Sequence, residues 1–368
     1  MQAGGSSEAL KAAAAASGSH LPWVEKYRPS TLESVVAHED ILSTLRHLMD
    51  SGNMPHLLLY GPPGTGKTTT IKACAYHLYG KDRVRANVLE MNASDDRGID
   101  VVRHQIREFS STSSIFSMMG PGSGGGGGGG GAAPTFKLVI LDEADQMSHD
   151  AQAALRRVIE KYTRNVRFCI LCNHINKIIP ALQSRCTRFR FAPVKKSAMM
   201  PRLRYVAEQE GVTHTTDGLA AAFRLSSGDL RRCLNTMQSA ALSTSEITVE
   251  SVYRVTGNPT PADVTAIVSD MLSGDFATSW ATVEAAVMQK GISMADLARE
   301  VHPIMMAMDL PHDCKCFLLM KLSDVEFHAA GGAREAVGLG GLLGAFQLVK
   351  EAVTQRKPIK DVAGDCVC

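Results

Sequence analysis

The residues with the clearest chemistry form a glycine-rich stretch that ends in a lysine and a threonine. The run Gly61-Pro62-Pro63-Gly64-Thr65-Gly66-Lys67-Thr68 fits the phosphate-binding pattern G-x-x-x-x-G-K-[ST] at every fixed position. Glycines in such a loop let backbone N–H groups turn toward phosphate oxygens. Lys67 can then reach the β- and γ-phosphates, and the Thr68 hydroxyl can bind Mg²⁺. The alternative is a glycine-rich turn without a ligand.

Two acidic residues follow an apolar run at 136–141. In phosphate-loop enzymes an Asp at the end of a buried strand serves the Mg²⁺ ion, which is the position of Asp142. Glu143 is then placed to orient or deprotonate an attacking water. The two acids could instead cap the next helix. Their distance along the chain from the phosphate-binding stretch favours the catalytic interpretation.

The elements that must position these residues alternate between strand and helix. The apolar run 57–60, the turn and the helical spacing of 69–79 give the strand–loop–helix order that the motif requires. Further strands at 87–92, 136–141 and 166–172, with helices between them, predict an α/β fold with a doubly wound parallel sheet. Ligands bind at the carboxyl ends of such strands. We therefore expect Asn173, which ends a strand, to lie near Lys67, Asp142 and Glu143.

Composition limits the remaining possibilities. At 368 residues the chain is long enough for two or three domains, and its formal net charge of +2 is too small to argue for nucleic acid. No apolar run approaches the length of a membrane span, so we expect an intracellular protein with no membrane partner. The C-x-x-C of Cys169 and Cys172 falls inside a strand, where the two thiols should face opposite sides. Without a second such pair at zinc spacing, we expect reduced thiols and no structural metal.

Changes in composition suggest five segments. We expect a disordered tail at 1–20, a nucleotide-binding domain at 21–193 with a flexible Gly-rich insertion at 118–135, and a small helical lid at 194–257. An all-helical domain follows at 258–358, and 359–368 is a tail. The segment 21–29, with two prolines and two aromatics, is expected to be extended. Strand signals stop near residue 193.

Several longer stretches together resemble one family. They are WVEKYRP (23–29), GPPGTGKT (61–68), NASDDRGID (92–100), LDEADQM (141–147), ALRRVIEKYT (154–163), LQSRCTRFRF (182–191) and GDLRR (228–232). Generic AAA+ proteins share only the phosphate loop and the acidic motif. The combination resembles the small subunits of replication factor C, the eukaryotic sliding-clamp loader, within the AAA+ ATPases. The resemblance implies an AAA+ phosphate-loop domain, a helical lid and a C-terminal helical collar.

The resemblance also implies roles for particular residues. Asn173 would be a sensor of the γ-phosphate and the attacking water, and Arg231, carried by the lid, would be a second sensor. Arg185 of the SRC motif would be an arginine finger that reaches a neighbouring subunit's site. The implied binding residues for ATP and Mg²⁺ are Val24, Tyr27 and Arg28 at the adenine base, Gly61, Pro62, Pro63, Gly64, Thr65, Gly66, Lys67, Thr68 and Thr69 in the loop, and Asp142, Asn173 and Arg231 around it.

The implied partners are the other replication factor C subunits in a heteropentamer, the sliding clamp and primer–template DNA, in the nucleus, for DNA replication and repair. Arg97, Arg103 and Lys177 are the candidates for DNA phosphate contacts, which set position without reading sequence. A solvated basic face is the alternative. Ile115 and Phe116 are the candidates for binding the clamp, with local core as the alternative.

Two other functions compete with this one. A different AAA+ DNA motor, of the branch-migration helicase type, would share the phosphate loop and the acidic motif. A nucleotide-binding scaffold that never hydrolyses ATP would belong to another class. The presence of Lys67, Glu143 and Arg185 argues against the scaffold, because a retired site tends to lose one of them.

Overall fold

The computed structural model describes residues 21–93, 99–111 and 136–363. The chain divides into two compact units, one ending at Thr248 and the other beginning at Val249. Each unit is described by itself.

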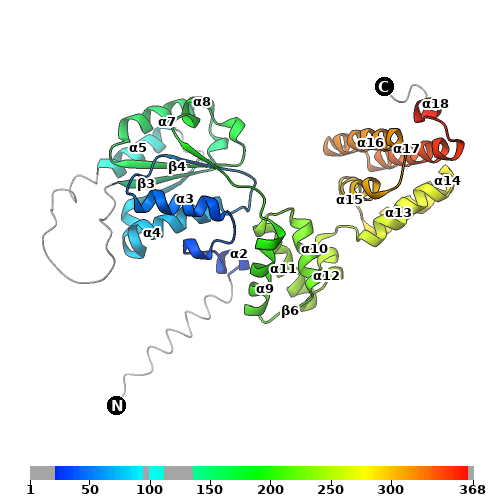
Figure 1. Ribbon diagram of the computed structural model, residues 1–368, viewed down its shortest axis with the longest axis horizontal. Coiled ribbons are helices and arrows are strands. Elements are labelled where there is room, and N and C mark those ends of the chain that lie inside the picture. The colour runs from blue at the N-terminus through cyan, green and yellow to red at the C-terminus, as the bar shows by residue number, and fades with distance from the viewer. Residues whose placement is uncertain (1–20, 94–98, 112–135, 364–368) are drawn as a thin grey trace, which may run out of the picture. The chain divides into compact units, whose positions relative to one another are not determined.

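The first unit contains a five-stranded parallel sheet, which confirms the predicted α/β fold (Figure 1). The strand order is β2-β3-β4-β1-β5. The strands are β1 Leu57–Tyr60, β2 Val88–Asn92, β3 Lys137–Asp142, β4 Val166–Cys172 and β5 Thr187–Arg190. Because β1 lies between β4 and β5, the loop after β1 begins at the carboxyl ends of the strands, beside the ends of β4 and β5.

Helices cover both faces of this sheet. The helices around it are η1 Leu32–Ser34, α3 Glu39–Asp50, α4 Lys67–Asn87, α5 Ile99–Ser111, η2 Ala144–Gln146, α7 His149–Tyr162, η3 Ile175–Lys177 and α8 Pro180–Gln183. A further helix, α2 Trp23–Lys26, precedes them in the chain. Leu57 and Leu59 pack with α3 and α4 on one face, and Leu58 packs with α5, α7 and α8 on the other. Cys169 and Cys172 likewise join the cores of opposite faces, as predicted from their spacing.

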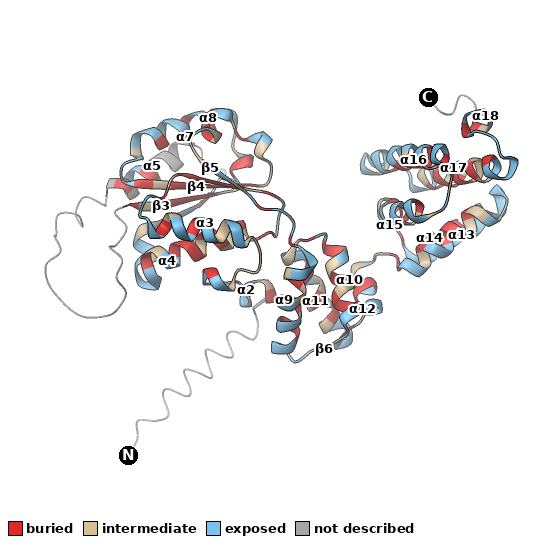
Figure 2. Cartoon of the chain, in the orientation of Figure 1, coloured by how far each residue is buried: buried red, intermediate tan, exposed pale blue. Residues whose placement is uncertain are grey.

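Both faces of the three inner strands β1, β3 and β4 are therefore buried, which explains why these strands are continuous apolar runs rather than alternating ones. Figure 2 shows the buried sides of α3 and α4 and the buried strands of the sheet. Gly80 interrupts α4 with non-helical angles (φ 71°, ψ 163°), so the predicted helix at 69–79 ends where a glycine permits a break.

The first unit continues with a small helical layer, the lid. It consists of α9 Lys196–Gln209, β6 Thr213–His214, α10 Thr216–Ser226, α11 Leu230–Thr244 and β7 Glu246–Ile247. The two short strands pair in parallel, so the expectation that strands stop near residue 193 was wrong. The expected extended segment at 21–29 was also wrong in part, because Trp23–Lys26 forms one helical turn. Strands of two residues and a helix of one turn are too short for a hydrophobic periodicity to be detected in the sequence.

The second unit is helical. Its helices are α12 Val249–Thr256, α13 Pro261–Ser273, α14 Phe276–Lys290, α15 Met294–Ala307, α16 His312–Ala330, α17 Glu335–Gln355 and α18 Ile359–Ala363. One apolar core joins α13 to α18. The last helix lies where we expected a tail, and it buries Ile359 and Ala363 in that core.

Helix α17 contradicts one expectation from the sequence. By length and composition alone it could cross a membrane, so the statement that no apolar run approaches that length was wrong. Its apolar side chains include Leu342, Leu343, Phe346 and Val349, which are buried against the other helices of the unit. Core helices of water-soluble domains have the same composition, so the helix is weak evidence for a membrane.

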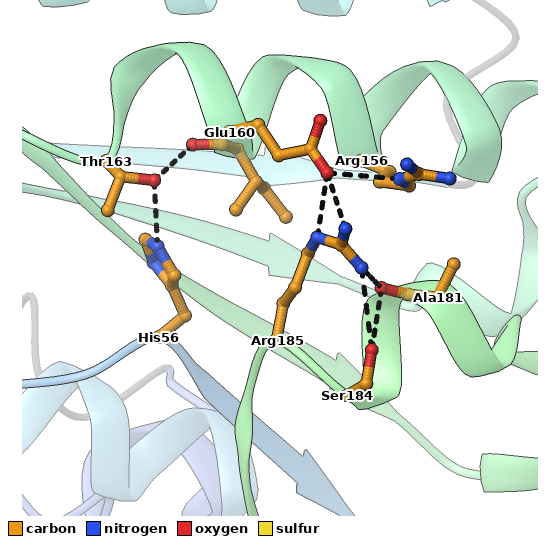
Figure 3. A network of polar contacts seen from close by, with 8 residues as sticks. His56, Arg156, Glu160, Thr163, Ala181, Ser184 and Arg185 are labelled. Atoms are coloured by element: carbon orange, nitrogen blue, oxygen red, sulfur yellow. Dashed lines mark hydrogen bonds and ion pairs between the residues drawn. The ribbon is translucent and has the colours of Figure 1, made fainter.

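A buried histidine holds the amino ends of the central strands and α7 together. His56 Nδ1 accepts the Phe168 N–H at 3.1 Å, which leaves Nε2–H to face Thr163 Oγ1 at 3.4 Å (Figure 3). Burial, with a smaller effect from the nearby Arg167 charge, lowers the pKa of His56 from 6.5 to about 4. The imidazole is therefore held neutral in the folded chain.

This histidine predicts a pH dependence of stability. Between about pH 6.5 and pH 4 the unfolded chain binds a proton at His56 that the folded chain does not, so stability falls as pH is lowered through that window. Replacing His56 with Gln removes this titration. Urea unfolding at several pH values should give a shallower loss of stability between pH 6.5 and 4 for H56Q than for the wild type. Equal slopes would mean that His56 does not titrate between these states.

Candidate functional site

The phosphate loop has the backbone geometry of an anion cradle. It leaves the carboxyl end of β1 at Gly61 and ends at the first turn of α4, so the positive end of the α4 dipole faces the loop. Gly61, at φ 147°, lies so close to the residue that follows β5 that a Cβ would stand 2.0 Å from the Phe191 carbonyl oxygen. Gly64 and Gly66 also have positive φ values. Side chains at these positions would prevent the chain from closing around a phosphate.

Lys67 crosses this loop and connects it to the end of β4. Its Nζ donates to the Gly61 oxygen at 2.7 Å, the Pro62 oxygen at 2.8 Å and Asn173 Oδ1 at 3.0 Å. All three ammonium hydrogens thus have acceptors, but none of these acceptors is charged. Burial lowers the pKa of Lys67, while Asp142 opposes that shift. A phosphate would supply the anion that this buried cation lacks.

Two oxygen-bearing side chains meet beside the loop. Thr68 Oγ1 donates to Asp142 Oδ2 at 2.9 Å, and the backbone N–H of Glu143 donates to Asp142 Oδ1 at 2.9 Å. A hydroxyl and a carboxylate are the kind of ligands that Mg²⁺ prefers. Glu143 is exposed and has φ 55°, a left-handed conformation that is uncommon for a residue with a side chain. Such backbone conformations are concentrated at functional sites.

These groups line one pocket of about 230 Å³. Of the residues predicted to bind nucleotide or Mg²⁺, the lining includes Val24, Tyr27, Arg28, Pro63, Gly64, Thr65, Gly66, Lys67, Thr68, Thr69, Asp142, Asn173 and Arg231, and it also includes Glu143, which was predicted to be catalytic. Gly61 and Pro62 lie behind it, where their carbonyl groups hold Lys67. Pro29, Leu230 and Leu234 complete the lining and add apolar surface at the end of the pocket formed by the α2 segment and the lid.

The lid contacts the phosphate loop directly. The Leu230 N–H donates to the Gly64 oxygen at 3.2 Å. Asp229 is the N-cap of α11, since its Oδ1 accepts the Arg232 N–H at 3.1 Å, and a Cβ on Gly64 would stand 1.6 Å from that same oxygen. The close approach requires glycine at position 64. It also places Arg231, in the first turn of α11, at the pocket.

The segment around α2 is attached to the lid by long-range contacts. The backbone N–H of Trp23 donates to Gln238 Oε1 at 3.1 Å, and Tyr27 Oη donates to Glu210 Oε1 at 2.5 Å. Lys26 Nζ forms an ion pair with the same Glu210 oxygen at 2.7 Å. Burial and the Glu210 hydrogen bond raise the pKa of Tyr27 well above its usual value. Trp23 is buried against the lid rather than lining the pocket, so only Tyr27 of the two aromatics faces the site.

Arg185 lies away from this pocket. It follows α8 at the amino end of β5, while the phosphate loop leaves the carboxyl end of the neighbouring strand β1. Its Nη2 and Nε contact Glu160 Oε1 at 2.6 and 2.9 Å, and its Nη1 donates to the Ala181 oxygen at 2.7 Å. Figure 3 shows Arg156 and Arg185 converging on Glu160. The hydrogen bond from Arg156 is the main cause of the low pKa of Glu160, with Arg185 contributing.

The remaining predicted residues are the candidates for contacts with DNA and with the clamp. Lys177 is exposed and ends η3, just after the strand that leads to Asn173. Arg103 belongs to α5, and its side chain lies outside the described set. Arg97, Ile115 and Phe116 lie outside the described residues altogether. Their roles therefore stay predictions.

Sequence reasoning missed several residues that hold the site together. The side chain of Gln152 is buried, and it connects α7 to Met147, Lys177 and Ile179. Asp145, Asp229 and Glu210 were also missed. The partners of Asp145 and Glu210 lie far away in the chain, so spacing carries no signal for these two residues. Asp229 did have a signal, because an Asp directly before a helix is a typical N-cap residue. Only the polar character of a residue on an otherwise apolar helix face could have drawn attention to Gln152.

Comparison with known proteins gives a consistent result. Residues 57–194 match the AAA family, "ATPase family associated with various cellular activities", and residues 259–345 match the replication factor C C-terminal domain. Replication factor C subunit 5 of Mus musculus is 47% identical, covering 92% of this chain and 96% of that protein. Replication factor C subunit 3 of Schizosaccharomyces pombe is 43% identical, covering 90% and 92%.

A solved structure of the Thermotoga maritima RuvB Holliday junction branch migration motor matches at 14% identity and a TM-score of 0.46. It covers 73% of this chain and 86% of that one. A likeness this distant does not bear on function.

The contact between lid and loop predicts different effects for two substitutions of Asp229. D229A and D229N both remove the charge, but only Ala removes the N-cap acceptor of α11. We expect D229A to destabilise the chain by about 1 kcal/mol relative to D229N. D229A should also bind ATP several-fold more weakly, because Arg231 loses its fixed position. Thermal unfolding and equilibrium ATP binding measure the two effects, and equal affinities would show that the cap does not position Arg231.

Proposed function

The chain belongs to the replication factor C subunits, as a clamp-loader ATPase subunit, and from this premise we propose how its site works and what it contacts. Within the family, Ser113–Phe116 together with the SRC motif and the intact phosphate loop most resembles the third small subunit of the yeast-type complex. The proposal is that this chain binds Mg·ATP, hydrolyses it together with a neighbouring subunit, and helps to open a sliding clamp and load it on primer–template DNA.

The observation that carries the proposal is the convergence of four segments on one pocket. The phosphate loop follows β1, Asp142 ends β3, Asn173 follows β4, and Arg231 comes from the lid. Positive-φ glycines, a helix N-terminus and a buried lysine fit a chain of phosphates. The adjacent oxygens of Thr68 and Asp142 fit Mg²⁺, which when bound would neutralise charge on the β- and γ-phosphates.

Each side chain then has a defined task. Lys67 exchanges its carbonyl and amide acceptors for phosphate oxygens, which relieves the cost of burying an unpaired cation. Glu143 accepts the proton of the attacking water or orients that water, since its carboxylate forms no ion pair among the described residues and lines the pocket. Asn173, released by Lys67, can then turn to the γ-phosphate and the water. Val24, Tyr27 and Arg28 lie at the end of the pocket suited to the adenine base.

Arg185 is proposed to act on a neighbouring subunit. Its place at the amino ends of the strands keeps it from the phosphates of its own site. In the isolated chain Glu160 neutralises the guanidinium, and the pair is partly exposed. A competing anion of higher charge, such as a γ-phosphate presented by a neighbour, can displace an exposed carboxylate because such ion pairs are weak. The site would then be complete only in the assembled complex.

The clamp and the DNA are proposed partners as well. Ile115 and Phe116 are proposed to bind the clamp, and Arg97, Arg103 and Lys177 to contact DNA phosphates, in a heteropentamer that acts in the nucleus. The support is the sequence resemblance together with the exposed position of Lys177. A clamp-loading assay with the assembled complex tests these partners, by counting clamp rings transferred to primed DNA.

The shared site predicts an effect in trans. R185A should leave ATP affinity of this chain unchanged, because Arg185 does not reach its own pocket. Hydrolysis at the adjacent subunit's site should fall by about 10³-fold or more, which is the range measured for arginine fingers. The measurement is the ATPase rate of assembled complexes in which only that adjacent site binds ATP.

Arg188, in β5, offers a matched control, since it is exposed and its guanidinium forms one hydrogen bond among the described residues, to Gln183 Oε1 at 3.5 Å. R188A should change the adjacent site's rate by less than about twofold, as surface cations contribute little. Undiminished hydrolysis in R185A, or equal losses in both variants, would remove Arg185 from catalysis.

A further inference from the structure

Asp145 is a buried carboxylate that lies behind the pocket rather than in its lining. It belongs to η2, directly after Asp142 and Glu143, and is 6% exposed. Its Oδ2 accepts the backbone N–H of His174 at 3.3 Å, and its Oδ1 is buried without a partner among the described residues. The carboxylate thus joins the end of β3 to the end of β4.

A buried carboxylate with an unpaired oxygen costs free energy that a neutral side chain would not. The turn does not need this group, because its backbone already closes through the hydrogen bonds Gln146 N–H to the Glu143 oxygen and Met147 N–H to the Ala144 oxygen. In the part of the chain that the structure describes, the carboxylate makes one hydrogen bond to another segment, and this is the interaction to explain. That contact is to the residue next to Asn173.

Asn173 depends on few interactions of its own. Its Oδ1 accepts a hydrogen bond from Lys67 Nζ at 3.0 Å, and its side chain makes no other hydrogen bond in the described part of the chain. This bond is lost when Lys67 turns to phosphates. The position of the Asn173 amide then depends on the backbone at 173–174, which Asp145 holds through the His174 N–H. At 3.3 Å the hydrogen bond is long, and catalytic hydrogen bonds of this kind commonly tighten once substrate is bound.

We propose that Asp145 is a positioning residue for ATP hydrolysis, which anchors the backbone of Asn173 so that its amide stays aligned after Lys67 has moved to the phosphates. The inference rests on the proposed function of the site and adds a residue that acts through Asn173. Asp145 does not touch the nucleotide. It therefore affects the rate of hydrolysis and leaves ATP affinity unchanged.

Two substitutions separate the anchor from the charge. D145A removes the acceptor, while D145N leaves an amide oxygen for the His174 N–H and removes only the charge. The full chain is assembled with its partner subunits, whose own phosphate-loop lysines are replaced by alanine, so that this site alone binds ATP. Equilibrium binding gives the affinity for ATP, and single-turnover hydrolysis gives the rate.

We expect D145A to slow hydrolysis by about 10- to 100-fold, since small misplacements of catalytic groups cost up to that much. ATP affinity should stay within about twofold, and D145N should hydrolyse within about threefold of the wild type. In an N173A background, D145A should cost less than about twofold more, because its effect passes through Asn173. Should D145A not assemble, D145L fills similar space without an acceptor and carries the same expectation.

Three results would overturn the inference. They are a normal rate in D145A, a D145N rate as low as that of D145A, or an undiminished D145A effect in the N173A background. A wild-type complex that binds no ATP at this site, or never hydrolyses it, would instead refute the proposed function.

Discussion

The site depends on one buried cation. Lys67 has three hydrogen-bond acceptors, all of them neutral, and burial already lowers its pKa. A cation in this condition is stabilised by any phosphate that enters the pocket. The hydrogen bond from Lys67 to Asn173 also links phosphate binding to Asn173, the residue proposed to sense the γ-phosphate. Lys67 cannot keep all three of its acceptors once it binds phosphates.

The parallel sheet makes this arrangement possible. Strands β1, β3 and β4 are neighbours in register, so the loop, Asp142 and Asn173 meet at one edge although they are far apart in the chain. The lid contacts the phosphate loop through the Leu230–Gly64 hydrogen bond, and Tyr27 is attached to the lid through Glu210. At the amino ends of the strands, Arg185 forms an ion pair with Glu160. One fold thus presents a nucleotide pocket at one edge and a cation for a neighbour at the other.

The sequence predicted the parts of the site that have a fixed spacing. The glycine loop, Lys67, Asp142 and Glu143 follow from short motifs, and Asn173 follows from the rule that strand ends meet at one edge. The parallel sheet followed from apolar runs buried on both faces. Asp145 and Glu210 could not be found in this way, because their hydrogen-bond partners lie far away in the chain. The one-turn α2 and the short β6–β7 pair are likewise held by tertiary contacts rather than by periodicity.

The affinity of the full chain for ATP, measured at equilibrium in K67A and K72A, tests the central claim most directly. Lys72 lies on the same helix and pairs with Glu90 at 2.6 Å, so K72A controls for loss of a cation near the loop. With hydrogen bonds to charged groups contributing about 1.5–3 kcal/mol each, K67A should bind ATP about 100-fold more weakly or worse. K72A should remain within about twofold of the wild type. Equal affinities of K67A and the wild type would contradict the account, because the phosphates would then bind elsewhere.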